Sequence, residues 1–216
     1  MRSLSFIFVL FCSLSLLADS RPQVLIIGDI IYNGPTREVS KALKSKVKVS
    51  FVKYSSWDST TALANFDKLL EGKKWDLIHF NYGLNDLMHK DPTVKKSIRV
   101  MHKDVGGVRV CSEKQYEKNL TEMVKRLKAT GAKVIWASTT PIIGSNGIHF
   151  AGDEVKYNQI AAKVMKKAGV PINDMHTYGK ESHKKVRHAK TYNYKGGKPL
   201  HAPLVDLIVK QLKIRK

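Results

Sequence analysis

The stretch WDLIHFNYGLNDL, residues 75–87, decides how the rest of the chain is organised. It opens with a largely apolar run over residues 77–80 that is typical of a strand. Gly83 then permits a sharp turn, and Asn85 and Asp86 follow it. In an open α/β sheet, ligands bind outside the carboxyl ends of the strands, so we expect Asn85 to present its amide to a crevice there. The alternative, in which Gly, Asn and Asp serve only the turn, stays open at this point.

The composition and the first residues predict one exported domain. The chain has 216 residues, of which 43% are hydrophobic and 26% charged, which suits a single α/β domain with a substantial core. Arg2, an apolar run over residues 6–17 and the triplet Ala-Asp-Ser at 18–20 form the pattern of a secretory signal peptide. We therefore predict a signal peptide at 1–20, a single domain at 21–216, and export to the periplasm or the medium. The apolar run is too short for a stable membrane span, and no later stretch is longer.

The cysteines and histidines predict neither a disulfide nor a metal site. Cys12 lies in the apolar run, so the mature chain retains only Cys111 and has no internal disulfide. The eight histidines are scattered, without an HExxH motif or Cys/His pairing. We expect no metal and no other cofactor.

The charge of the chain favours an anionic partner. The formal net charge is +20 and the pI is about 9.9. Such an excess attracts polyanions, and acidic polysaccharide is the favoured class because no nucleic-acid motif is present and predicted export argues against nucleic acid. The lysines are spread over nearly every predicted helix, so a solvated basic surface without a dedicated partner stays an open alternative. Nothing in the sequence predicts the oligomeric state.

Strands and helices alternate along the whole chain. The predicted strands are residues 24–27, 47–52, 77–80, 134–137 and 170–172, and the predicted helices are 35–45, 59–71, 113–130, 153–168, 176–189 and 204–212. The strand at 47–52 has alternating polarity and is expected near an edge, and Ser112 to Gln115 form a capping box for the helix that follows. Residues 88–111 are expected to form a long irregular insert, which is usually functional or mobile. The alternation predicts a single three-layer α/β/α domain with a parallel sheet.

Several short segments at predicted strand ends carry a resemblance to a known family. The segments IIGDII (26–31), GLND (83–86) and KPLHAP (198–203) resemble the first, third and last sequence blocks of the SGNH/GDSL hydrolases. Three longer segments, residues 74–87, 116–141 and 155–175, resemble a bacterial, exported branch of the same family. The resemblance covers most of the mature chain and implies a mostly parallel, flavodoxin-like five-stranded sheet.

The resemblance also implies a chemistry, which is acyl transfer. In the family, a Ser attacks an ester carbonyl, a late His takes its proton, and an Asp three residues before that His orients it, while backbone N–H groups and an Asn hold the oxyanion. Carried over to this chain, Asn85 is the oxyanion residue, His201 is the base, and Asp29 belongs to the first-block scaffold. The implied substrates are small acyl or acetyl esters, including those on carbohydrate.

Two members of the catalytic set are replaced here. Ile30 stands at the nucleophile position and Lys198 stands where the orienting Asp is expected, and the second-block Gly has no clear match in residues 54–60. His201, between Pro199 and Pro203, is either the base or a residue that only caps the last helix.

Two outcomes follow from these replacements. Loss of the nucleophile leaves a residual rate of roughly 10³–10⁴ over water, and the protein is then a pseudoenzyme whose crevice and basic surface hold an acidic polysaccharide. Alternatively, another hydroxyl near a strand end replaces the serine. The candidates are Ser55, Ser56, Ser138, Thr139 and Thr140.

Overall fold

Five parallel strands form the central sheet of the protein. The computed structural model describes residues 20–52, 57–95, 97–183 and 199–214, so the predicted signal peptide lies almost wholly outside the described residues. The strands are β1 (Gln23–Ile27), β2 (Lys48–Phe51), β3 (Leu77–Phe80), β6 (Lys133–Ala137) and β7 (Ile172–Asn173), in the order β2-β1-β3-β6-β7. This is the flavodoxin-like order, with β2 at an edge, as the sequence predicted.

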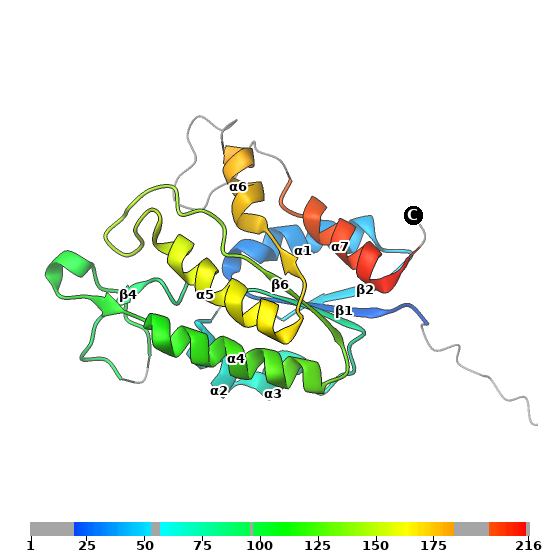
Figure 1. The fold of residues 1–216 in the computed structure, drawn as a ribbon, viewed down its shortest axis with the longest axis horizontal. Helices are drawn as coiled ribbons and strands as arrows, with labels where there is room; N and C mark the ends of the chain where they lie inside the picture. Colours follow the sequence, from blue (N-terminus) through cyan, green and yellow to red (C-terminus); the bar gives the residue numbers. More distant parts are fainter. Residues whose placement is uncertain (1–19, 53–56, 96, 184–198, 215–216) are drawn as a thin grey trace, which may run out of the picture.

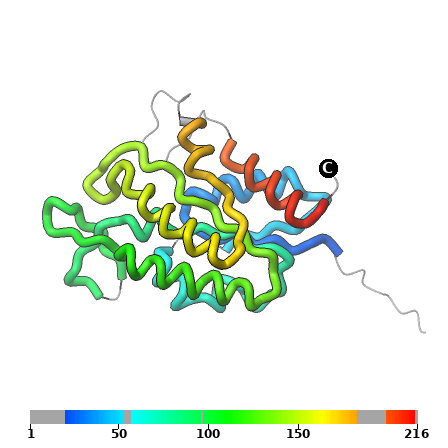
Figure 2. Tube along the Cα trace, viewed as in Figure 1, coloured from blue at the N-terminus to red at the C-terminus, as the bar shows by residue number. Residues whose placement is uncertain are grey.

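Helices cover both faces of this sheet (Figure 1). They are α1 (Asn33–Ala42), α2 (Ser59–Ala64), α3 (Phe66–Leu70), α4 (Glu113–Ala129), α5 (Asp153–Ala168), α6 (Met175–His183) and α7 (Ala202–Leu212). Figure 2 shows α4 and α5 running side by side in the same direction, and α1 lying beside α7 across the sheet from them. The three-layer α/β/α prediction is confirmed.

The apolar run of β1 explains why both faces need covering. Leu25 and Ile27 belong to the core under α2–α5, whereas Val24 and Ile26 belong to the core under α1 and α7. All four side chains are fully buried, and each such burial contributes about 1.5–3 kcal/mol. A strand with apolar side chains on both faces can lie only in the middle of such a sandwich.

Only one of the two hydrogen bonds of the capping box predicted at Ser112 forms. Ser112 Oγ accepts a hydrogen bond from the Gln115 N–H at 3.3 Å, as predicted for the start of α4. The side chain of Gln115 does not return to Ser112; its amide donates to Asn119 Oδ1 at 2.7 Å. Asn119 is buried, and this hydrogen bond satisfies its side-chain carbonyl oxygen.

The prediction of a single helix over residues 59–71 is wrong, because the helix is interrupted at Asn65 and forms α2 and α3 instead. Asn65 leaves the helical region at φ −117° and ψ 28°, and its side-chain amide donates to the Thr61 carbonyl at 2.9 Å. Asparagine commonly competes in this way with the helical hydrogen bonds of the backbone. The predicted helix over 176–189 begins at Met175 and is described as far as His183.

The prediction of an irregular insert over residues 88–111 is also wrong in part. The insert contains the antiparallel pair β4 (His89–Lys90) and β5 (Val108–Arg109) and a short helix, η2 (Lys103–Val105). It is held to the loop before α5 by the His89 N–H, which donates to the Ile148 carbonyl at 3.2 Å, and by the Lys103 N–H, which donates to the Gly147 carbonyl at 3.0 Å. Its role stays untested.

None of the described helices is both long and apolar enough to cross a bilayer. Cys111 is buried and carries a free thiol.

Candidate functional site

The carboxyl ends of β1, β3 and β6 are tied together by Asn81, the first residue after β3. Its N–H donates to the Ile27 carbonyl at 3.1 Å, and its side-chain amide donates to the Ala137 carbonyl at 2.8 Å. Gly28 packs so closely here that a Cβ would lie 2.4 Å from the Asn81 carbonyl oxygen, and its φ of +149° also favours glycine. The carboxyl ends of these three strands therefore lie together at one edge of the sheet, and a crevice shared with the loop that carries His201 stays a prediction.

Asp29 holds the loop that carries Asn85. It follows β1 and is fully buried, and its Oδ2 accepts a hydrogen bond from the Leu84 N–H at 2.9 Å. Burial raises the pKa of Asp29 to about 8, although the Leu84 N–H opposes the shift; the nearby charge of Asp86 adds to it. Asp29 is thus a buried hydrogen-bond acceptor that connects β1 to the turn after β3, and this contact fits the scaffold role predicted for it.

His149 contacts the same loop from the other side. Its Nε2 lies 3.0 Å from the Leu84 carbonyl oxygen, so that nitrogen carries the proton and donates. Burial lowers the pKa of His149, which keeps the ring neutral. Leu84 is therefore held through both its N–H and its carbonyl group, immediately before Asn85. The sequence reasoning missed His149, because only the tertiary fold places the loop before α5 against this turn.

Asp86 connects the loop to α2. It is fully buried, and its Oδ1 accepts hydrogen bonds from the Ser59 hydroxyl at 2.5 Å and from the Ser59 N–H at 3.0 Å. Asn119 donates in turn to the Ser59 hydroxyl at 2.8 Å. Burial raises the pKa of Asp86 to about 7; Ser59 opposes this shift and the neighbouring Asp58 adds to it. Ser59 and Asn119 were not singled out from the sequence, since a Ser at a helix start and an Asn within a helix are too common to signal a site.

Asn85 itself is only partly buried, whereas Leu84 and Asp86 on either side are buried. Gly83 permits this arrangement, because a Cβ there would lie 2.1 Å from Thr139 Oγ1. Fixed on both sides, the loop holds the backbone of Asn85 at the carboxyl edge of the sheet. The role of the Asn85 amide as an oxyanion donor stays a prediction.

Ile30 occupies the first position after Asp29. It begins the short helix η1 (Ile30–Tyr32), and the residue is 56% exposed. An exposed isoleucine at this point contributes neither to the core nor to any nucleophilic chemistry.

His201 lies at the start of α7. It is partly buried, and its carbonyl accepts the Val205 N–H at 3.0 Å in the first turn. The pKa of Glu38 in α1 is lowered first by the hydrogen bond from Lys41 and to a smaller extent by His201, which places His201 near α1. Lys198 lies outside the described residues. The role of His201 as base therefore stays a prediction.

The hydroxyls at the end of β6 are buried. Ser138 Oγ accepts the His176 N–H at 2.8 Å and lies 3.3 Å from Asp174 Oδ1, so it serves the start of α6. Thr139 packs against Gly83, and Thr140 is also buried. Ser55 and Ser56 lie outside the described residues. A substitute nucleophile among these five positions stays a prediction.

In the described part of the chain, no group of three or more His, Cys, Asp and Glu side chains is arranged to hold a metal ion. The charge of Asp58 adds to the raised pKa values of Asp29 and Asp86, and each of these three carboxylates accepts a structural hydrogen bond.

The chain is similar to proteins of one family over most of its length. The model of the GDSL-like lipase/acylhydrolase family matches residues 31–201. No curated protein sequence matches the chain significantly.

Solved structures extend this comparison. The acetyl xylan esterase AlAXEase shares 15% identity at a TM-score of 0.62, with 88% of this chain and 99% of that chain covered. The acetylxylan esterase Axe2 from Geobacillus stearothermophilus shares 14% identity at a TM-score of 0.62, with 90% and 95% covered. A lipase/acylhydrolase from Enterococcus faecalis shares 14% identity at a TM-score of 0.61, with 89% and 95% covered. At such identities the likeness shows a shared fold.

Proposed function

Because the chain belongs to the GDSL-like lipase/acylhydrolase family, we propose that its crevice binds a small acyl ester, including an acetyl ester on carbohydrate, and turns it over weakly or not at all. Ile30 carries this proposal. It stands where the family resemblance places the serine nucleophile, and its exposed hydrocarbon side chain cannot attack a carbonyl. The predicted export would bring the protein to extracellular or periplasmic substrates.

The residues that remain fit an ester-binding role. The amide of Asn85 is a donor for the carbonyl oxygen of the ester, and Asp29 and His149 hold the backbone beside it. His201 is the base in this proposal, and Lys198 would repel an imidazolium where an aspartate would stabilise it. Binding without efficient turnover is the expected result of keeping the oxyanion donors and losing two members of the triad.

Hydrolysis of a small activated acetate ester by four forms of the mature protein tests this proposal. They are the wild type, Ile30→Ser, the double variant Ile30→Ser/Lys198→Asp, and His201→Ala. We expect a silent or very slow wild type, and a gain of activity in the double variant that exceeds the gain in the single variant. If the wild type turns over the ester and His201→Ala abolishes that activity, the proposed loss of activity is wrong. A substitute nucleophile would then have to be found by labelling with a serine-directed fluorophosphonate.

The charge of the chain supports a second candidate function, the binding of an acidic polysaccharide by a non-catalytic protein. The net charge of +20 is large for 216 residues and exceeds what solubility requires. Salt-sensitive retention on an acidic polysaccharide, with no ester turnover, is the result expected for this candidate.

A further inference from the structure

The insert over residues 88–111 presents valines on one face of a small sheet. β4 pairs with β5 on one side and with Val100 on the other, and in both pairings the partner of Lys90 is a valine, Val108 or Val100. Directly paired residues of antiparallel strands carry their side chains on the same face. Val100, Lys90 and Val108 therefore form one row, here called the valine face, in which the two valines are 47% and 43% exposed.

The opposite face of this small sheet packs on the domain. His89 is buried, its Nδ1 lies 2.8 Å from the Ile148 carbonyl oxygen, and its ring meets Phe150 edge-on at 5.3 Å between ring centroids. Arg109, which pairs with His89 across the sheet, donates to Asp153 in α5 at 2.7 Å. Because one face is fixed to the domain in this way, the valine face is held outward.

The turn that leads into β5 is apolar as well. Val105 ends the short helix η2, between Val100 and Val108, and is 70% exposed. Three of the six large apolar residues that are exposed in the described chain thus lie within residues 100–108. In Figure 1 the insert forms one end of the molecule, beyond the start of α4. Exposed apolar residues that gather in one place, and do not lie scattered singly, indicate an interaction site.

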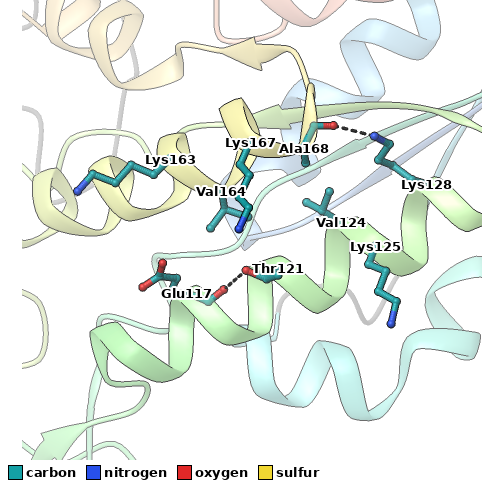
Figure 3. Close-up of a pocket in the computed structure, with 9 residues that line it drawn as sticks. All are labelled: Glu117, Thr121, Val124, Lys125, Lys128, Lys163, Val164, Lys167 and Ala168. Atoms are coloured by element: carbon teal, nitrogen blue, oxygen red, sulfur yellow. Dashed lines mark hydrogen bonds between the residues drawn. The ribbon is translucent and has the colours of Figure 1, made fainter.

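The valines between α4 and α5 are the contrasting case. Figure 3 shows Val124 of α4 and Val164 of α5 in the space between the two helices, and both residues are buried. Lys128 bridges the same two helices, since its ammonium group donates to the Ala168 carbonyl at 2.7 Å. These valines already have partners within the domain, whereas those of the insert are left to solvent.

The charge of the insert selects the class of partner. Residues 88–111 contain six Lys and Arg and two Asp, which gives a formal net charge of +4. Asp91 is buried and paired with Arg99, so within the described part of the insert Asp104 is the only exposed carboxylate. A second copy of the same face would be repelled by this charge. The insert therefore suits an anionic partner.

Cations lie beside the exposed valines. Lys90 stands between Val100 and Val108 in the valine face, and Lys95 is exposed on the loop that follows β4. Among the described residues, neither lysine has an ion-pair partner. A lysine can keep its hydrocarbon stem on apolar surface while its ammonium group contacts an anion. Apolar surface between cations matches an anionic bilayer, whose headgroups are charged and whose interior is apolar, whereas a hydrophilic polysaccharide would leave the valines in water.

We propose that the insert over residues 88–111 binds to the surface of an anionic lipid membrane. The valine face and Val105 enter the headgroup region of the bilayer, and Lys90 and Lys95 contact lipid phosphates. The proposal goes beyond both candidate functions above and is independent of them, since no residue of the crevice takes part. Binding of this kind is reversible and requires no membrane-spanning helix.

Co-sedimentation of the mature protein with vesicles tests the proposal, and it compares an equimolar mixture of phosphatidylglycerol and phosphatidylcholine with phosphatidylcholine alone. Val105→Ser/Val108→Ser removes exposed apolar surface from the insert without changing the net charge. The matched control is Val155→Ser/Ile172→Ser, which removes it from α5 and β7, where both residues are 39% exposed. We expect the wild type to bind to the mixed vesicles, the insert variant to bind about fivefold or more weakly, and the control to differ by less than about twofold.

A second pair of variants tests the cations. Lys90→Gln/Lys95→Gln should weaken binding to the mixed vesicles by about tenfold or more, because each basic residue near an anionic membrane contributes roughly fivefold. Lys44→Gln/Lys48→Gln removes the same charge at exposed positions near the amino end of the sheet, and it should weaken binding by less than about threefold. An unchanged midpoint of urea unfolding shows that each variant retains the fold.

Every other outcome overturns the proposal. If the wild type does not bind to the mixed vesicles, or binds equally well to phosphatidylcholine alone, an anionic membrane is the wrong partner. If the two valine variants bind equally well, or the two lysine variants do, the insert is the wrong surface. If the wild type binds to polygalacturonate and not to vesicles, the partner is a hydrophilic polyanion and the membrane proposal is wrong.

Discussion

Replacing Gly83 with alanine tests whether close packing at the turn after β3 positions the Asn85 loop. A Cβ at Gly83 would lie 2.1 Å from Thr139 Oγ1 and 3.3 Å from both Thr139 Cβ and the Tyr116 hydroxyl oxygen. The first contact is far inside van der Waals distance, and Thr139 and Tyr116 are both buried, so the turn, the Thr139 side chain or the segment after β6 must move. Overpacking of this kind costs about 1–3 kcal/mol, and we expect Gly83→Ala to destabilise the fold by an amount in that range.

The structure also predicts which second change relieves the clash. Thr139 Oγ1 has no hydrogen-bond partner in the described part of the chain, so Thr139→Ala removes the clashing atom without leaving a partner unsatisfied. The double variant Gly83→Ala/Thr139→Ala should therefore be more stable than the sum of the two single costs predicts, by about 1–2 kcal/mol. The two remaining contacts at 3.3 Å are tight but tolerable, so the rescue is partial.

Urea unfolding at 25 °C, monitored by tryptophan fluorescence, measures these free energies, and an unchanged m-value supports two-state analysis. Thr139→Val is the matched control, because it keeps a carbon where the hydroxyl oxygen stands and should give no rescue. The steric explanation is wrong if the costs of Gly83→Ala and Thr139→Ala add to within about 0.5 kcal/mol in the double variant. It is also wrong if Thr139→Val rescues Gly83→Ala as well as Thr139→Ala does.

Three further predictions concern the carboxylates and the amide of the crevice. The pKa of Asp29 is raised from 3.8 to about 8 and that of Asp86 from 3.8 to about 7, so the stability that each contributes is complete below pH 3.8 and is lost as pH rises to the raised value; each should cost the wild type about 1.4 kcal/mol per pH unit within its own window. Asp29→Asn should remove about half of the slope below pH 7 in urea unfolding at pH 5, 6.5 and 8, and an unchanged slope would show that other groups cause it. Ser59→Ala removes a hydroxyl donor from Asp86 and should cost about 2 kcal/mol at pH 8 and less at pH 5, where Asp86 is protonated; equal costs at both pH values would contradict a charged acceptor. In the serine-restored double variant, Asn85→Ala should lower kcat by roughly 10²–10³ with little change in KM, and an unchanged kcat would remove Asn85 from the oxyanion site.

Most of the fold could be predicted from local patterns in the sequence. The run at residues 24–27 is apolar at every position, which only a strand buried on both faces requires, and the stripe from Tyr116 to Leu127 has the period of one helix face. The sheet order followed from the alternation of strands and helices together with the family resemblance. The break at Asn65 was missed, because a single asparagine in a helical pattern competes with the backbone only when its side chain finds a carbonyl, here that of Thr61.

The chemical groups at the strand ends can be read from the amino-acid sequence: an Asp and an Ile after β1, a Gly-x-Asn-Asp turn after β3, and a late histidine before α7. The behaviour of these groups depends on the folded chain. Folding placed His149 against Leu84, and it buried Asp29 and Asp86 deeply enough to raise their pKa values. Each of these results depends on burial or on contact between segments far apart in the chain. Local sequence determines backbone preference and side-chain chemistry, but desolvation and long-range contacts exist only once the chain has folded.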